Sequence, residues 1–80
     1  MPERHLNIAG YKFIVLDDRD ALRQPFKKRC DALGLKGTIL LSHEGINIFI
    51  AGPETAIASF REYLSEDIRF ADIEFKESYS

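Results

Sequence analysis

The chain has 80 residues and a formal net charge of −2 at pH 7, and 45% of its residues are apolar and 30% charged. This length suits one domain spanning residues 1–80 and leaves no room for a second, and the composition excludes a disordered chain. The net charge argues against a domain that grips nucleic acid alone, because phosphate neutralisation requires clustered lysine and arginine.

The N-terminal part of the chain predicts a strand followed by a helix. Residues 6–16 are rich in β-branched and aromatic side chains, and the polar cluster 17–20 can end a strand and cap a helix. The start of the helix stays open. With a start near Asp20, Pro25 removes an early hydrogen bond, whereas with a start at Gln24 it takes the favoured first position. The apolar stripe of this helix is Leu22, Phe26, Cys30 and Leu33, and Gly34 supplies its left-handed stop.

The middle of the chain predicts a β-hairpin and then a second helix. Residues 37–42 and 46–51 read as strands, and Gly45 takes a positive φ in the turn between them. Pro53 occupies the first position of the next helix, and Glu54 places a carboxylate near the positive end of its dipole. The buried stripe of this helix is Ile57, Phe60 and Leu64.

The last strand is predicted at residues 71–78, where apolar and charged side chains alternate. The element order is therefore βαββαβ. This order predicts an α+β, ferredoxin-like two-layer sandwich, in which two helices cover one face of a four-stranded antiparallel sheet. The first and third strands are central in that topology, and the fourth is at an edge, which agrees with its one polar face.

Alternation along the strands predicts which residues lie on the uncovered face of the sheet. On the third strand, Ile46, Ile48 and Ile50 are expected to point toward the helices. On the first strand, Tyr11, Phe13 and Val15 are expected to do the same. The uncovered face then carries Lys12, Ile14, Asn47, Phe49, Glu74 and Lys76. Its apolar centre and charged rim are typical of a docking surface.

An independent RNA-binding module is a second interpretation of this face. RNA-recognition motifs stack bases on aromatic residues of the two central strands, and on the faces assigned above only Phe49 qualifies. The run 47–50 also lacks the basic, glycine and aromatic signature of that module. Simple packing is the more usual explanation of a lone aromatic residue on a half-covered sheet, so this interpretation ranks second.

No catalytic site, metal site or cofactor is predicted. Acylphosphatases share this topology but need a phosphate-binding loop, and here the acidic loop 17–20 would repel an anion. Cys30 is expected to pack as a small hydrophobe. His43 and Glu44 form either an acid/base pair or simply a turn. His5 and His43 have no second cysteine or paired carboxylate at ligand spacing.

The chain shows neither an N-terminal leader pattern nor an apolar stretch long enough to span a bilayer. Its single cysteine also excludes an internal disulfide framework, which small secreted domains often need. We therefore expect a soluble cytoplasmic protein with no membrane partner.

Residues 35–47, which read LKGTILLSHEGIN, and the following Ala51 and Gly52 resemble the N-terminal hallmark of the rhodanese-related tRNA uridine hydroxylases. The resemblance extends to residues 11–13 and 69–78, so it covers nearly all of the chain. Members of that family often carry glycine and threonine after the hallmark, whereas this chain has Ile48 and Phe49.

The resemblance implies an oxygen-dependent enzyme that hydroxylates the wobble uridine of certain tRNAs, with an acylphosphatase-like N-terminal domain ahead of a rhodanese-like catalytic domain. The family's reactive cysteine belongs to the rhodanese loop, and no position here matches it. The chain is then an accessory domain that positions tRNA or supports the catalytic domain. Its expected partners are the rhodanese-like domain of the same protein and, through the full-length protein, tRNA.

The alternative is a free-standing RNA- or protein-binding module with no enzymatic role. On either interpretation, residues of the hairpin and the uncovered face are the candidates for binding. Hairpin geometry alone explains the residues of the hairpin equally well, because a tight turn needs glycine and tolerates asparagine beside it. The candidate binding residues are Glu44, Gly45 and Asn47 of the hallmark, with Lys12 and Phe49.

Overall fold

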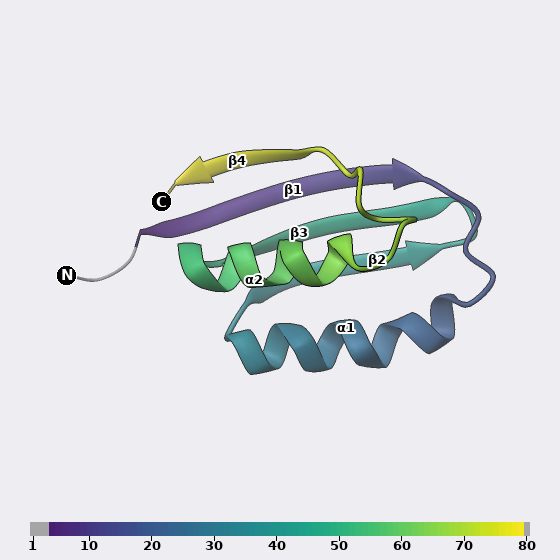
Figure 1. Ribbon diagram of the computed structural model, residues 1–80, viewed down its shortest axis with the longest axis horizontal. Helices are drawn as coiled ribbons and strands as arrows, with labels where there is room; N and C mark the ends of the chain where they lie inside the picture. Colours follow the sequence, from purple (N-terminus) through teal and green to yellow (C-terminus); the bar gives the residue numbers. More distant parts are fainter. Residues whose placement is uncertain (1–3, 80) are drawn as a thin grey trace.

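The structure is a computed structural model that describes residues 4–79. The strand order across the sheet is β2-β3-β1-β4, and all neighbouring strands are antiparallel. Both helices lie on the same side of this sheet (Figure 1). The α+β ferredoxin-like prediction is therefore confirmed, with β1 and β3 central and β4 at an edge. The elements are β1 (His5–Phe13), α1 (Arg19–Leu33), β2 (Lys36–Ser42), β3 (Gly45–Pro53), α2 (Glu54–Ser65) and β4 (Phe75–Tyr79).

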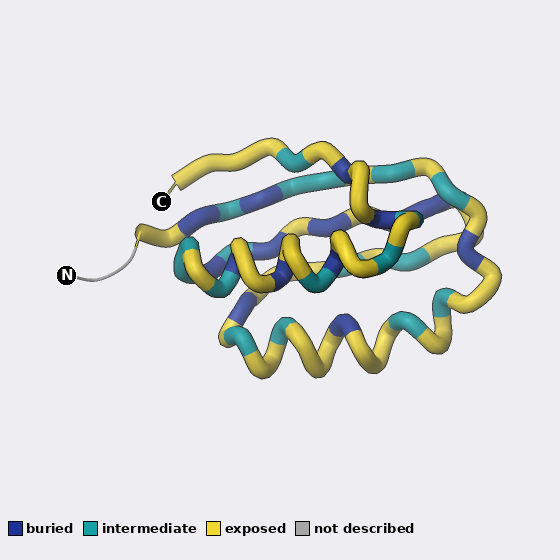
Figure 2. The backbone as a smooth tube through the Cα atoms, in the orientation of Figure 1, coloured by how far each residue is buried: buried dark blue, intermediate teal, exposed yellow. Residues whose placement is uncertain are grey.

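The hydrophobic core lies between the helices and one face of the sheet. Ile46, Ile48 and Ile50 of β3 are all buried there, which confirms that this set points toward the helices. α1 contributes one buried side chain, Phe26, and is exposed or half-buried along most of its length (Figure 2). The remaining predicted helix residues also pack on the core: Leu22, Cys30 and Leu33 of α1 are half-buried, and Ile57, Phe60 and Leu64 of α2 are buried.

The two ends of α1 settle one open alternative and confirm one prediction. The helix begins at Arg19, so Pro25 lies inside it and not at its first position. The carbonyl of Asp18 accepts the first hydrogen bonds, from the N–H groups of Ala21 and Leu22. At the other end, Gly34 has a φ of 71°, the left-handed conformation that glycine adopts at low cost.

Three predicted boundaries are wrong. β1 ends at Phe13 and not at residue 16. Pro53 ends β3 with a φ of −58° and a ψ of 147°, so α2 begins one residue later, at Glu54. β4 begins at Phe75, because the segment before it forms turns: the N–H of Phe70 donates to the carbonyl of Asp67, and the N–H of Ile73 donates to that of Phe70. The alternation that predicted a strand from residue 71 therefore begins in a turn.

The prediction for the two faces of β1 is also wrong. Lys12 lies opposite Ile46 on the helix side, together with Ile14, whereas Tyr11 and Phe13 lie on the other side. The reason is at the start of the strand, where Leu6 and Ile8 are buried on the helix side. Pairing with β3 runs without interruption from His5 to Phe13, so the alternation set by Leu6 and Ile8 continues to the end. Val15, beyond the strand, is exposed as well.

Neither helix of residues 4–79 is long and apolar enough to cross a membrane.

Candidate functional site

The face of the sheet opposite the helices carries large exposed side chains, and we call it the open face. Tyr11, Phe13, Leu40 and Phe49 expose 44%, 74%, 61% and 67% of their surface there. They come from three neighbouring strands, so the exposed apolar surface extends across the middle of the sheet. The open face consists of Ala9, Tyr11, Phe13, Thr38, Leu40, Asn47, Phe49, Glu74 and Lys76.

Three aromatic residues of the open face stand on the two central strands. In the register of β1 and β3, Tyr11 lies opposite Asn47 and Phe49 lies opposite Ala9, and directly opposite residues share a face. The ring centroids of Tyr11 and Phe13 are 4.8 Å apart, with an angle of 89° between their planes. The prediction that Phe49 alone is available for stacking is therefore wrong, because it followed from the wrong face of β1.

A depression of about 570 Å³ lies on the open face. Its lining includes Tyr11 and Phe49, and the polar side chains of Asn47 and Lys76. Ala9 contributes to the hollow because a small side chain opposite Phe49 leaves space beside the ring. A mostly apolar concavity with a few polar groups is the usual form of a binding site.

Asn47 and Phe49 are thus on the open face as predicted, whereas Lys12 is not. The Lys12 side chain is only 25% exposed and points to the loop between α2 and β4. Its ammonium group donates a hydrogen bond of 2.6 Å to the carbonyl of Arg69 and forms an ion pair with Asp72. This ion pair lowers the pKa of Asp72. The Lys12 cation is therefore engaged within the fold.

Glu44 and Gly45 join the hairpin to β1 through their backbones. The N–H of Ile14 donates to the carbonyl of Glu44 at 3.0 Å. Gly45 has a φ of 158°, which is positive as predicted but close to extended backbone. A Cβ atom at Gly45 would lie 2.1 Å from the carbonyl oxygen of Lys12, so only glycine lets the strands approach this closely. Backbone packing by itself accounts for glycine at this position.

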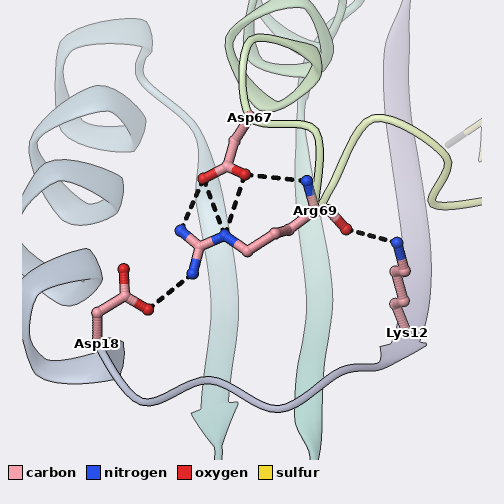
Figure 3. Close-up of polar contacts among 4 residues, drawn as sticks. All are labelled: Lys12, Asp18, Asp67 and Arg69. Carbon is pink, nitrogen blue, oxygen red and sulfur yellow. Dashed lines mark hydrogen bonds and ion pairs between the residues drawn. The ribbon is translucent and has the colours of Figure 1, made fainter.

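Arg69 links two loops at one end of the sheet (Figure 3). Its Nη2 donates to Asp67 at 2.7 Å, and its Nη1 donates at the same distance to Asp18, ahead of α1. These hydrogen bonds lower the pKa of both carboxyl groups and raise that of the guanidinium. The loop between β1 and α1 is therefore held to the α2–β4 loop by an internal ion-pair network.

His43 and Cys30, which the sequence also singled out, contribute to a loop contact and to core packing. Nδ1 of His43 lies 2.8 Å from Nη1 of Arg19, so the hairpin tip contacts the start of α1. Cys30 packs against the core as predicted, and its burial raises the pKa of the thiol. Among the residues that the structure describes, no three histidine, cysteine, aspartate or glutamate side chains are grouped as metal ligands.

The sequence of the chain is similar to that of known proteins. Residues 5–80 match the family described as the UPF0176 acylphosphatase like domain. The chain belongs to this family. The hallmark LKGTILLSHEGIN, residues 35–47, runs from the end of the α1–β2 connection through β2 and the turn into β3. It therefore includes Asn47 of the open face.

Relatives in this family carry the name tRNA uridine(34) hydroxylase. Those of Cupriavidus necator and Bordetella avium are each 57% identical to the chain over 75 residues, and that of Variovorax paradoxus is 56% identical. The matches cover 94% of this chain but only 27%, 31% and 28% of the respective relatives. The chain thus spans less than a third of the length of these relatives, and the resemblance to tRNA uridine hydroxylases is confirmed.

Proposed function

We propose that this chain is an accessory domain of a tRNA uridine hydroxylase and that it acts through the open face, by positioning tRNA or by supporting the catalytic domain. One observation carries the proposal. The helices close one side of the sheet, while Tyr11, Phe13, Leu40 and Phe49 remain exposed on the other. Proteins that act alone seldom leave so much contiguous apolar surface in water.

The chemistry of the chain supports an accessory role over a catalytic one. In the described residues 4–79, the groups with shifted pKa values are Asp18, Asp67, Arg69 and Asp72 of the two loops and Cys30 of α1. Burial raises the pKa of the Cys30 thiol, which disfavours the reactive thiolate. We assign the hydroxylation of the wobble uridine to a rhodanese-like domain elsewhere in the longer protein. The proposed location is the cytoplasm, where tRNA is used.

A second candidate function is a free-standing binding module. The observation that favours it is the core of residues 4–79, which the chain closes by itself between its helices and sheet. Such a module would bind RNA or protein through the same open face. It differs from the accessory domain in needing no other part of a protein for its function.

Three purified proteins test the proposal: the intact gene product, the same product without residues 1–80, and residues 1–80 alone. Each is incubated with unmodified tRNA and oxygen, and hydroxylated uridine is quantified by nucleoside mass spectrometry. We expect activity from the first protein, a large loss in the second and none in the third. An inactive intact product would overturn the hydroxylase assignment. Full activity without residues 1–80, or activity of residues 1–80 alone, would overturn the accessory role.

A further inference from the structure

We infer that the open face binds unpaired RNA bases by stacking, with Tyr11 and Phe49 as the two platforms. The inference rests on the proposed function, which supplies tRNA as the partner and an unpaired uridine as the base. It goes further by naming the ligand chemistry of the open face and the two rings that contact it.

The two rings lie on the two central strands of the sheet, Tyr11 on β1 and Phe49 on β3. Because Tyr11 lies opposite Asn47, Phe49 is its diagonal neighbour, about 7–8 Å away between Cα atoms. Two neighbouring bases can therefore each meet one ring. Base stacking on aromatic residues of the central strands is how this topology holds single-stranded RNA in other proteins.

Polar side chains lie beside the two rings. Asn47 is exposed beside Tyr11, and its amide offers both a donor and an acceptor. The imide edge of uracil presents the complementary acceptor and donor. Lys76 lines the same depression and can meet a phosphate. The depression thus combines ring faces for stacking with one amide suited to the edge of a uracil base.

The charges of the open face predict weak binding. Lys76 is accompanied by Glu74, and the Lys12 ammonium is engaged with Asp72 on the other side of the sheet. With about one phosphate contact, the slope of log K against log salt should be near −0.7. Two stacked bases without further cations imply a dissociation constant on the order of a millimolar. Weak, salt-insensitive binding fits a domain that places a base while the rest of the enzyme holds the tRNA.

The competing occupants are another protein surface and a second copy of the chain, which would use apolar area irrespective of ring chemistry. Phe49→Leu separates these cases, because leucine keeps apolar bulk but has no aromatic face. Phe49→Tyr restores the aromatic face. Leu40→Ala removes apolar area from the same face, and Ile68→Ala removes an exposed apolar side chain of the α2–β4 loop, outside the open face.

The test has two readouts. First, the 80-residue chain is titrated with oligouridine and followed by amide chemical shifts, since residues 4–79 form a buried core between the helices and the sheet. We expect shifts confined to the open face, lost in Phe49→Leu and kept in Phe49→Tyr and Ile68→Ala. Second, the KM of the intact gene product for tRNA should rise roughly 5- to 100-fold in Phe49→Leu, with a smaller change in Leu40→Ala.

Each contrary outcome is informative. Oligouridine shifts that persist in Phe49→Leu, or a complete lack of shifts, would overturn the inference. An equal effect of Leu40→Ala and Phe49→Leu on KM would overturn it in favour of protein docking, as would dimerisation of the chain through this face in sedimentation. If the intact product hydroxylates tRNA and Phe49→Leu changes nothing, the inference fails while the proposed function stands. If the product is inactive but the shifts depend on Phe49, the proposed function fails and the base-binding face stands.

Discussion

Tyr11 lies directly opposite Asn47 in the register of β1 and β3, with its side chain on the face of the sheet that no helix covers. Phe49, two residues further along β3, shares that face, whereas Ile46 and Ile48 fill the core. β3 therefore has two separate tasks. One set of its residues stabilises the fold, and the other forms the open face.

The Arg69 network should stabilise the connection between the β1–α1 loop and the α2–β4 loop. Replacing Arg69 with methionine removes the hydrogen bonds to Asp67 and Asp18. Because the guanidinium is partly exposed, we expect the free energy of unfolding in urea to fall by about 1 kcal/mol. Arg23→Met is the matched control, since Arg23 forms a 3.5 Å pair with the exposed Asp20 on one helix. Equal losses in the two variants would show that the network adds nothing.

The same network predicts a pH dependence of stability. Hydrogen bonds from Arg69 lower the pKa of Asp67 below its ordinary value of 3.8. A carboxyl group with a lowered pKa in the folded state stabilises the fold fully above its unfolded pKa, and this contribution is lost as the pH falls through the folded pKa. The difference in unfolding free energy between the wild type and Asp67→Asn should therefore be constant near neutral pH and shrink below 3.8. In the Arg69→Met background this decrease below pH 3.8 should be smaller. A decrease of the same size in that background would show that a group other than Asp67 paired with Arg69 causes it.

The elements of the fold could be predicted from the sequence, because each carries a local signal. The helical stripe that ends at Gly34 and the alternation of β3 both survive in the structure. The face of β1 could not be assigned, because this strand is apolar on both sides. Leu6 and Ile8 compete with Tyr11 and Phe13, and packing in the core decides between the two sets.

Lys12 and Asp72 show a second limit of prediction. A lysine in a strand predicts a solvent-facing side, yet Lys12 lies on the helix side, where its ammonium reaches Asp72 and the carbonyl of Arg69. Both partners are more than fifty residues away in the chain. The same contacts help to hold residues before β4 in turns, so the strand predicted from residue 71 starts at Phe75. Tertiary contacts of this kind leave no local signal in the sequence.

Two glycine substitutions should differ in their cost for a steric reason. Alanine at position 45 would place its Cβ 2.1 Å from the carbonyl oxygen of Lys12, so β1 and β3 must separate. Alanine at position 34 has nothing within 4 Å but must adopt a φ of 71°. We expect losses in unfolding free energy of about 3 kcal/mol for Gly45→Ala and about 1 kcal/mol for Gly34→Ala. If Gly45→Ala lost less unfolding free energy than Gly34→Ala, contact between the strands would not be what requires glycine at position 45.

Cys30 should react slowly with thiol reagents. Its side chain packs against the core, and burial raises the pKa of the thiol above the ordinary value of 9.0. Since the thiolate is the reactive form, the rate of disulfide exchange in the folded chain should be well below that of the unfolded chain at the same pH. The rate is measured with a chromogenic disulfide, with and without urea. Equal rates would contradict the packed position of Cys30.

The central claim is that the open face, and not the interior of this chain, serves tRNA hydroxylation. A variant that tests this claim must still fold. The double variant Tyr11→Thr with Phe49→Thr should change the unfolding free energy by about 1 kcal/mol or less, because both side chains are exposed and threonine suits a strand. Phe60→Ala, in the core, should cost about 3–5 kcal/mol.

The most direct measurement is the kcat/KM of the intact gene product for unmodified tRNA, read from hydroxylated wobble uridine by mass spectrometry. The paired variant Tyr11→Thr with Phe49→Thr is compared with Ile68→Thr, which removes an exposed apolar side chain outside the open face. We expect a fall of about tenfold or more in the paired variant and no change in Ile68→Thr. Wild-type kcat/KM in the paired variant would contradict the claim.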